Sequence, residues 1–190
     1  ADFEKYLDEE LRRLKTDRID VYLLHNLSHT HWEQVKRFDG LSFLDKMVEK
    51  GKILFKAFSI HNTLPAFMQI VDACDWDMAQ IQLNILDEKQ QAGIGGLKYG
   101  AAKGLAMVVM EPLRGGNLLN AVPKEVRDLL ARHPEKRSLV EWCFRWLYDK
   151  PEVSVILSGT RTLEQLKDNL RIFDRARPGV MSGDDHRLIA

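Results

Sequence analysis

The sequence predicts an α/β protein that is built on a parallel sheet. Two observations support this prediction: short apolar runs alternate with longer segments of helical period, and three of the four gaps between successive runs approach the roughly 30 residues of a βαβ unit. The runs are apolar on both faces, which is typical of parallel strands with helices on one side and core on the other. The five expected strands are Ile19–His25, Ile53–Ser59, Met78–Leu86, Leu105–Met110 and Val153–Leu157.

Helices with recognisable ends are expected around these strands, as one leading helix and five βα units. Gly51 and Gly104 stand where a glycine commonly follows the last turn of a helix. Ser138-Leu-Val-Glu141 and Thr162-Leu-Glu-Gln165 have the spacing of capping boxes. The apolar segment Trp142–Leu147 is expected to be core and not a binding platform. The expected helices are Glu4–Lys15, Phe43–Lys50, Pro65–Cys74, Gly96–Lys103, Pro123–Arg132, Ser138–Asp149 and Thr162–Ala176.

Composition and charge exclude several classes of protein. The 190 residues are 45% hydrophobic and 29% charged, which suits one globular domain over residues 1–190. Lys+Arg and Asp+Glu are both 28, so the chain lacks the basic field that non-specific nucleic-acid or membrane-surface binding needs. Cys74 and Cys143 are too few and too far apart for a disulfide scaffold or an all-cysteine metal site. No run is long enough to span a membrane, and a cytoplasmic protein is expected.

Two other patterns predict ordinary structure. The glycines from Gly93 to Gly96 lack the third glycine of a dinucleotide fingerprint, because Lys98 occupies that position. His25, His29 and His31 have no carboxylate or thiolate at ligand spacing, so no metal site is predicted. The segments expected to be loops are Gly93–Gly96 and Asn26–Glu33.

Five strands suit two architectures. An open, doubly wound sheet can be built from five strands, whereas a closed (β/α)₈ barrel needs eight strands and about 250 residues. Hydrophobic periodicity does not separate the two.

Five motifs are spread along nearly the whole chain: Leu11–Asn26, Phe58–His61, Gln80–Asn84, Met110–Leu118 and Leu157–Asn169. In this order they resemble the aldo-keto reductase family. The sequence of Met110–Leu118 is similar to that of bacterial and archaeal members of the family, which often carry a ferredoxin-like tail. The resemblance implies a partial (β/α)₈ TIM barrel whose five parallel βα units correspond to strands 4 to 8 of the family barrel, with the N-terminal strands absent from residues 1–190.

The resemblance implies an NAD(P)H-dependent oxidoreductase that reduces an aldehyde or ketone to an alcohol. His25 is the implied catalytic residue, because its imidazole would hydrogen-bond the substrate carbonyl. The resemblance apart, a satisfied core or surface histidine is the more ordinary interpretation. The family's catalytic tyrosine, lysine and aspartate belong to strands that precede this part, so the chain alone is expected to be inactive. The alternative is a catalytically silent barrel fragment, or a cofactor-sensing scaffold that pairs with another chain.

The resemblance also implies a site for NADP or NAD. Ser59 and Gln80 would hold the nicotinamide carboxamide, although both could instead cap backbone groups. Met110 stands where the family has an aromatic ring, and a thioether gives the nicotinamide a less directional contact. The other implied cofactor contacts are Pro112, Leu113, Arg114, Gly116, Leu118, Gly159, Thr160, Arg161, Gln165, Asp168 and Asn169.

Several positions depart from the family pattern and predict weak cofactor binding. Ile60 replaces the usual asparagine, and Gly159 and Gln165 replace the basic pair of many NADP-preferring members. Arg161 or Arg171 could compensate for the missing charge. Gln165 is explained equally well as the third residue of its capping box.

The expected partner is a small-molecule carbonyl substrate, with no nucleic acid and no membrane. The strands Ile19–His25 and Val153–Leu157 would leave two open edges without the inward lysine or proline that protects a natural edge. Self-association, or pairing with the missing N-terminal barrel segment, is therefore expected.

Overall fold

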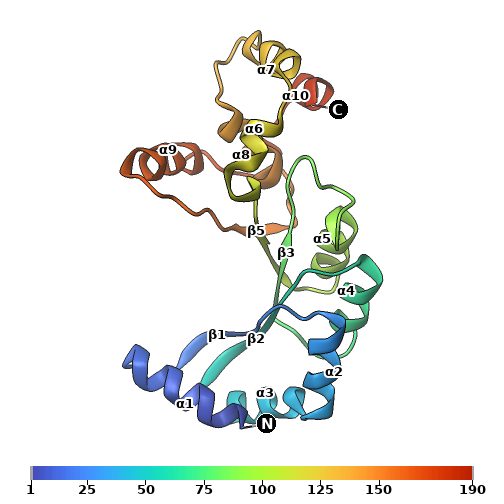
Figure 1. Cartoon of the computed structure of the whole chain (residues 1–190), viewed down its shortest axis with the longest axis vertical. Coiled ribbons are helices and arrows are strands. Elements are labelled where there is room, and N and C mark those ends of the chain that lie inside the picture. The colour runs from blue at the N-terminus through green and yellow to red at the C-terminus, as the bar shows by residue number, and fades with distance from the viewer. Residues whose placement is uncertain (1, 190) are drawn as a thin grey trace. The chain divides into compact units, whose positions relative to one another are not determined.

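The computed structural model describes residues 2–189 and shows an α/β fold with five parallel strands in one sheet (Figure 1). The strands follow one another in the sheet in chain order, from β1 to β5. The predicted α/β class with five parallel βα units is confirmed. The strands are β1 (Ile19–Leu24), β2 (Ile53–Ile60), β3 (Met78–Gln82), β4 (Ala106–Met110) and β5 (Val153–Ile156).

The described residues form two compact units. Unit 1 contains residues 2–81 and 89–107, and unit 2 contains residues 82–88 and 108–189. None of the helices in residues 2–189 combines the length and the apolar character that a membrane span needs.

Unit 1 is built on β1, β2 and the greater part of β3. The register pairs Leu24 of β1 with Phe58 of β2, and Ser59 of β2 with Gln80 of β3. Phe58 is fully buried, and its ring lies 4.9 Å from that of Trp76, so the C-terminal half of β2, where Ala57–Ile60 are all buried, lies in the core. The helices of unit 1 are α1 (Phe3–Leu14), α2 (His29–Arg37), α3 (Gly40–Glu49), α4 (Leu64–Val71) and α5 (Gly93–Ala102).

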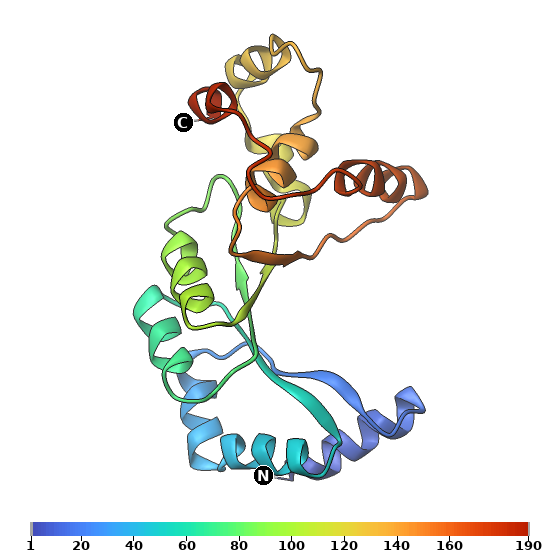
Figure 2. The same ribbon diagram turned by 180° about the vertical axis from the view of Figure 1, so that it is seen from behind.

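Helix α5 corrects one prediction, because the expected loop Gly93–Gly96 is its first turn. Helices α4 and α5 lie side by side (Figure 2). A Cβ added at Gly96 would come within 3.3 Å of the Phe67 ring, and one added at Gly100 within 2.4 Å of the Met107 sulfur. The glycines are therefore compatible with a helix here because they permit close packing, which outweighs their low intrinsic helix propensity.

Helix α2 corrects a second prediction, because it begins inside the expected loop Asn26–Glu33. The Ser28 hydroxyl accepts a hydrogen bond from the N–H of His31 at 3.2 Å, which is an ordinary N-cap. Trp32 and Val35 are the two buried residues of this helix. Burial of these two side chains stabilises a segment whose polar composition suggested a loop.

Strand β3 is shorter than expected. It ends at Gln82, whereas the apolar run predicted a strand to Leu86. The side chain of Asn84 accepts the N–H of Leu86 at 3.1 Å, and its carbonyl accepts the N–H of Asp87 at 3.0 Å. The chain therefore turns at Asn84.

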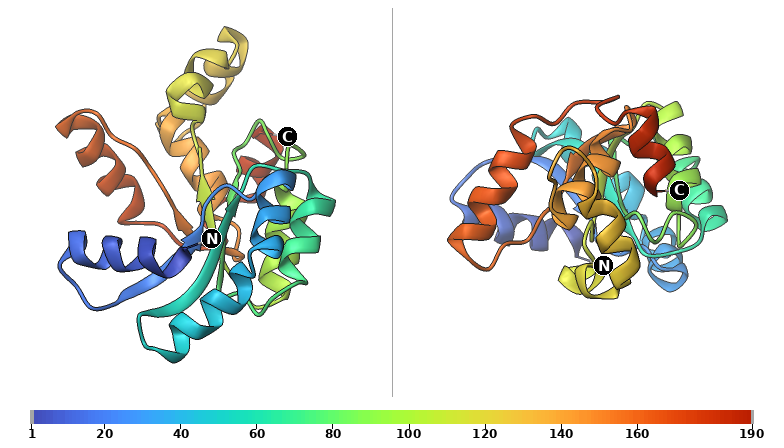
Figure 3. Two further views of the ribbon diagram at one scale, coloured as in Figure 1. Left: turned by 60° about the horizontal axis from the view of Figure 1, so that its bottom comes forward. Right: turned by 90° about the horizontal axis from the view of Figure 1, so that it is seen from above.

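Unit 2 has helix α8 at its centre. All eight residues from Glu141 to Tyr148 are buried, which confirms the prediction of a core helix. Only the C-terminal end of α9 packs on α8, through Ile172 and Phe173, and the rest of α9 stands away from it (Figure 3). The helices of unit 2 are the 3₁₀ turn η1 (Arg114–Gly116), α6 (Asn117–Ala121), α7 (Lys124–Ala131), α8 (Leu139–Tyr148), α9 (Leu163–Phe173) and α10 (Gly183–Ile189), of which η1, α6 and α10 were not expected.

Strands β1 and β5 end the strand order, so each has an unpaired edge within residues 2–189. Val21 on β1 is 42% exposed and Val155 on β5 is 48% exposed. An open edge with exposed apolar side chains is a template for strand pairing.

We expect the purified chain to self-associate through these edges. Val21→Lys or Val155→Lys should raise the monomer fraction, because a charge on an edge strand opposes pairing. Val126→Lys is the matched control, since Val126 is 41% exposed but lies on helix α7. Light scattering after size-exclusion chromatography measures the result. A chain that is monomeric at every concentration, or an equal effect of the control, would contradict the prediction.

Candidate functional site

The predicted site residues of unit 1 lie on three neighbouring strands, two of them at the carboxyl ends. His25 follows β1 directly, Ser59 is next to last in β2, and Gln80 lies within β3. Ser59 and Gln80 are register partners, and Leu24 before His25 is the partner of Phe58 before Ser59. The structure therefore brings these three residues to adjacent positions.

Ser59 holds the turn that carries His25. It is 1% exposed, its Oγ accepts the N–H of Asn26 at 2.8 Å, and its carbonyl oxygen accepts the N–H of Leu27 at 2.8 Å. Asn26 has a φ of +52°, a left-handed conformation that asparagine adopts more readily than most residues. The His25 side chain is exposed beside this turn. Ser59 thus caps backbone groups, and its O–H remains able to donate.

The main predicted loop of unit 2 follows β4. Glu111, Arg114, Gly115 and Gly116 all have positive φ, from 50° to 94°. A Cβ added at either glycine would meet nothing within 4 Å. The glycines are therefore required by the left-handed backbone, and their main chain is open on the side where a Cβ would lie.

Three apolar residues anchor this loop, which we call the glycine turn (Glu111–Gly116), to the core of unit 2. Pro112 is buried, Leu118 is fully buried, and Leu113 packs against the cluster of Phe144, Tyr148 and Ile172. The carbonyl of Leu113 also accepts the N–H of Gly116 at 2.8 Å. The glycine turn is thus held by both ends.

A buried carboxylate holds the side chain of Arg114. Asp87 is 3% exposed and accepts hydrogen bonds from Nε and Nη2 of Arg114 and from Nδ2 of Asn84. Burial alone would raise the pKa of Asp87, but the bonds from Arg114 and Asn84 outweigh it and hold that pKa below its usual value. The predicted charge of Arg114 is therefore neutralised by a neighbour within the same unit.

The residues after β5 contact one another. Gln165 accepts the N–H of Arg161 through Oε1 at 2.8 Å, and its own N–H bonds the Thr162 hydroxyl at 3.2 Å. Nδ2 of Asn169 donates to the Ser158 hydroxyl at 2.9 Å. Gln165 and Thr162 thus cap α9. Gly159 has nothing within 4 Å of an added Cβ, while Thr160 is half-buried.

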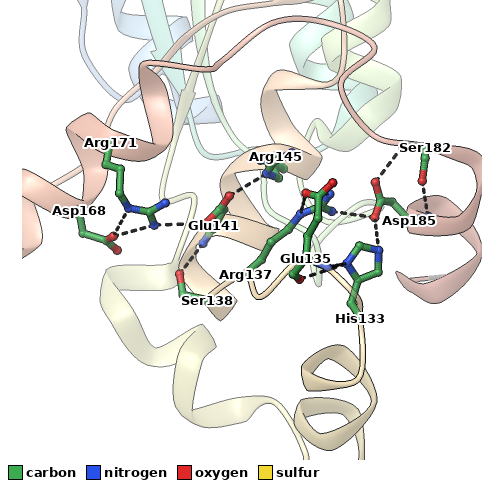
Figure 4. Close-up of polar contacts among 10 residues, drawn as sticks. All are labelled: His133, Glu135, Arg137, Ser138, Glu141, Arg145, Asp168, Arg171, Ser182 and Asp185. Carbon is green, nitrogen blue, oxygen red and sulfur yellow. Dashed lines mark hydrogen bonds and ion pairs between the residues drawn. The ribbon is translucent and has the colours of Figure 1, made fainter.

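Arg171 and Asp168 bond each other. Arg171 donates to Asp168 Oδ1 at 2.9 Å and to Glu141 Oε2 at 3.2 Å (Figure 4). Glu141 also accepts Nε of Arg145 at 3.0 Å. The sequence suggested that the positive charge of Arg171 could attract a cofactor phosphate. In the structure Arg171 instead pairs with these carboxylates.

A second buried carboxylate fixes helix α10. Asp185 accepts Nη1 of Arg137 at 2.7 Å, lies 3.1 Å from Nε2 of His133, and accepts the N–H of Ser182 at 2.8 Å (Figure 4). The guanidinium of Arg137 also bonds Glu135. These contacts join the start of α10 to the segment before α8.

The polar groups that orient these loops were not predicted from the sequence. Asn84 and Asp87 stand three residues apart just after an apolar strand, and that pattern was the available signal for a polar turn. No comparable signal pairs Asp185 with Arg137, which is 48 residues away. In the described part of the chain, no group of three or more His, Cys, Asp or Glu side chains is placed to hold a metal ion.

Ser59→Ala should lower the free energy of unfolding by about 1–3 kcal/mol, because the half-buried N–H of Asn26 would lose its acceptor. His25→Ala is the control and should change stability by less than about 0.5 kcal/mol, since its side chain is exposed. Urea unfolding followed by circular dichroism measures both values. Wild-type stability of Ser59→Ala would show that the hydroxyl does not hold the turn.

Asp185 should make stability depend on acid pH. Burial alone would raise its pKa, but the N–H of Ser182 and the guanidinium of Arg137 outweigh it and hold the pKa below its usual 3.8. The stabilisation is therefore fully present above pH 3.8 and is lost as the pH falls through the lowered folded-state value.

Asp185→Asn should accordingly lower the free energy of unfolding by about 2 kcal/mol at pH 7, and the difference from wild type should shrink below about pH 4. Asp184→Asn is the control, because the neighbouring Asp184 is exposed and pairs with the exposed Arg187. Urea titrations at several pH values test this. A constant difference at all pH values would contradict it.

Comparison with known proteins identifies the family. The aldo/keto reductase family model matches residues 1–178. A search of curated protein sequences found no significant match.

Solved structures of aldo-keto reductases share the fold. The holo form of a Bacillus halodurans enzyme has a TM-score of 0.78 at 20% identity, over 97% of this chain and 64% of its own. A Klebsiella pneumoniae enzyme in complex with NADP and acetate has a TM-score of 0.76 at 19% identity, over 100% of this chain and 64% of its own. Another Klebsiella pneumoniae structure, in complex with NADPH, has a TM-score of 0.71 at 20% identity, over 98% of this chain and 63% of its own.

The chain therefore spans slightly less than two thirds of these structures, and its five strands form a partial TIM barrel of the type they contain. The family resemblance of its motifs is confirmed by the match over residues 1–178. This chain belongs to the aldo/keto reductase family.

Proposed function

We propose that this chain forms the nucleotide-binding and carbonyl-orienting part of an NAD(P)H-dependent oxidoreductase that reduces an aldehyde or ketone to an alcohol. The observation that carries the proposal is the pair of hydrogen bonds from Asn26 and Leu27 to Ser59, which hold His25 beside Ser59 and Gln80. Membership of the family supports the oxidoreductase class. The related Klebsiella pneumoniae structures with NADP and NADPH support a nicotinamide cofactor.

The donors on this chain fit a nicotinamide nucleotide. A carboxamide needs both a donor and an acceptor, and the Ser59 hydroxyl with the Gln80 amide provides both. The open main chain at Gly115 and Gly116 suits close approach of a pyrophosphate. Met110 would contact the nicotinamide ring. When bound, a reduced nicotinamide supplies the hydride for carbonyl reduction.

The adenosine end of the proposed site is built mostly from neutral groups. Gly159 and Thr160 would face the phosphate beside the start of α9, with Arg161 as an exposed cation. Gln165 already caps the helix, and Asp168 adds a negative charge. We therefore expect weak binding of both NADPH and NADH, with little preference for the 2′-phosphate.

His25 would donate a hydrogen bond to the substrate carbonyl oxygen and so orient and polarise it. Within residues 2–189, no tyrosine lies at the carboxyl end of a strand. Tyr22 is inside β1, where burial raises its pKa to about 12 and makes it a poor acid, and the other tyrosines are on helices. In this proposal the catalytic tyrosine, lysine and aspartate belong to residues outside this chain, and the chain alone is inactive.

A second candidate is a catalytically silent fragment or a cofactor-sensing scaffold that pairs with another chain. The exposed edges of β1 and β5 favour it, because they offer backbone groups for pairing.

We place either form in the cytoplasm. Cys74 and Cys143 are both free thiols, which is typical of reducing compartments.

Cofactor binding is the first test. Fluorescence titration of the 190-residue chain with NADPH and NADH should give saturable binding, weaker than micromolar for both. His25→Ala should leave this binding unchanged, because the imidazole is assigned to the substrate. No binding of either nucleotide would overturn the proposal, and tight binding with strong NADPH preference would contradict the assignment of a weak phosphate site.

Carbonyl reduction is the second test, in a form complemented by co-expression with a family segment that carries the first three strands. His25→Ala should lower kcat/KM by about 100-fold, in the range typical of lost proton or hydrogen-bond catalysis. His29→Ala on helix α2 is the matched control and should retain activity. Saturable binding without any reduction in the complemented form would favour the scaffold.

A further inference from the structure

We infer that Asp87 is a positioning residue for the glycine turn: it holds Arg114 away from the cofactor, so that the turn binds the pyrophosphate through its backbone amides and not through the guanidinium. This inference rests on the proposed function, since it names how the same nucleotide site is held. It reverses the expectation that Arg114 contributes its charge to the anion.

The geometry of the pair carries the first step. Nε of Arg114 donates to Oδ2 of Asp87 at 2.7 Å, while Nη2 donates to Oδ1. Two parallel bonds of this kind are the strongest pairing that a guanidinium makes with a carboxylate. They occupy the Nε–Nη2 edge of the guanidinium and offset its charge.

Asp87 cannot easily release this partner. The carboxylate is 3% exposed, and Asn84 and Gln82 donate to the same Oδ2 atom at 2.8 and 3.2 Å. Loss of the guanidinium would leave a buried charge with amide partners only, which is costly. A phosphate that bound the Nε–Nη2 edge of Arg114 would therefore have to replace a paired carboxylate, whereas close approach to the main chain of Gly115, where an added Cβ would meet nothing within 4 Å, displaces no side chain.

The backbone conformation of Arg114 explains why the turn needs this support. Arg114 has a φ of +50°, in the left-handed region that is unfavourable for a residue with a Cβ. It is followed by Gly115 and Gly116 at +64° and +94°. The bond to Asp87 fixes the side chain of the strained residue, while Asn84 links the same carboxylate to the carbonyl of Glu111 at 3.4 Å. The carboxylate network therefore contacts the turn at two points.

The two roles considered for the Asp87–Arg114 pair predict opposite effects of Asp87→Asn on NADPH binding. If Asp87 positions the turn, loss of its charge should weaken NADPH binding by roughly tenfold, the lower end of the losses seen when outer-shell partners are removed at metal sites. If Arg114 contacts the phosphate directly, the same change should free the guanidinium and strengthen binding. Arg114→Lys separates charge from geometry, because lysine keeps the charge but loses the two parallel bonds.

The experiment is titration of the 190-residue chain with NADPH, for wild type, Asp87→Asn, Arg114→Lys and the double variant. We expect both single variants to weaken binding similarly and the double variant to be no worse than either, because they break one interaction. Asp128→Asn is the control, since Asp128 is an exposed partner of Lys124 on helix α7. Hydrogen exchange of residues 111–118 without nucleotide should become faster in both single variants and the double variant, but not in Asp128→Asn.

The outcomes distinguish the two proposals. Failure of the wild-type chain to bind NADPH would overturn the proposed function. Normal or tighter NADPH binding by Asp87→Asn, or unchanged hydrogen exchange in residues 111–118, would overturn the positioning role of Asp87 while leaving the proposed function intact. If Asp87→Asn does not fold, Arg114→Lys still tests the positioning role. Arg114→Lys leaves the buried Asp87 carboxylate beside a cation, so this carboxylate keeps a charged partner.

Discussion

Buried polar groups at the ends of parallel strands must find partners, and this requirement shapes the loops of the present chain. Ser59 in unit 1 and Asp87 in unit 2 are each at least 97% buried. The Ser59 hydroxyl oxygen accepts a hydrogen bond from the N–H of Asn26. The Asp87 carboxylate accepts hydrogen bonds from the side chains of Arg114 and Asn84. Because an unpaired buried polar group costs more than the bond itself contributes, these pairings hold the turns in one conformation.

The same pairings explain why the proposed site relies on neutral donors. Arg114 and Arg171 are both committed to carboxylates, so their charges are offset before any ligand binds. Groups that stay exposed include the imidazole of His25, the side chain of Arg161 and the main chain of Gly115. A site of this kind gains affinity from a preformed backbone more than from attraction between charges.

The sequence was most informative where burial alone decides structure. The apolar runs located all five strands, and the cap at Ser138 located helix α8. Helix α2 was missed because its polar composition conceals two buried residues, and the start of α5 because packing against α4 outweighs glycine propensity. The pairing of Asp87 with Arg114 joins residues 27 positions apart, so no local pattern could reveal that the arginine is neutralised.

The most direct measurement is a crystal structure of the 190-residue chain with NADP bound. Our account predicts the carboxamide on Ser59 and Gln80, the pyrophosphate on the main chain of the glycine turn, and Arg114 still bonded to Asp87. A nucleotide bound elsewhere, or a guanidinium that has left Asp87 to contact the phosphates, would contradict it.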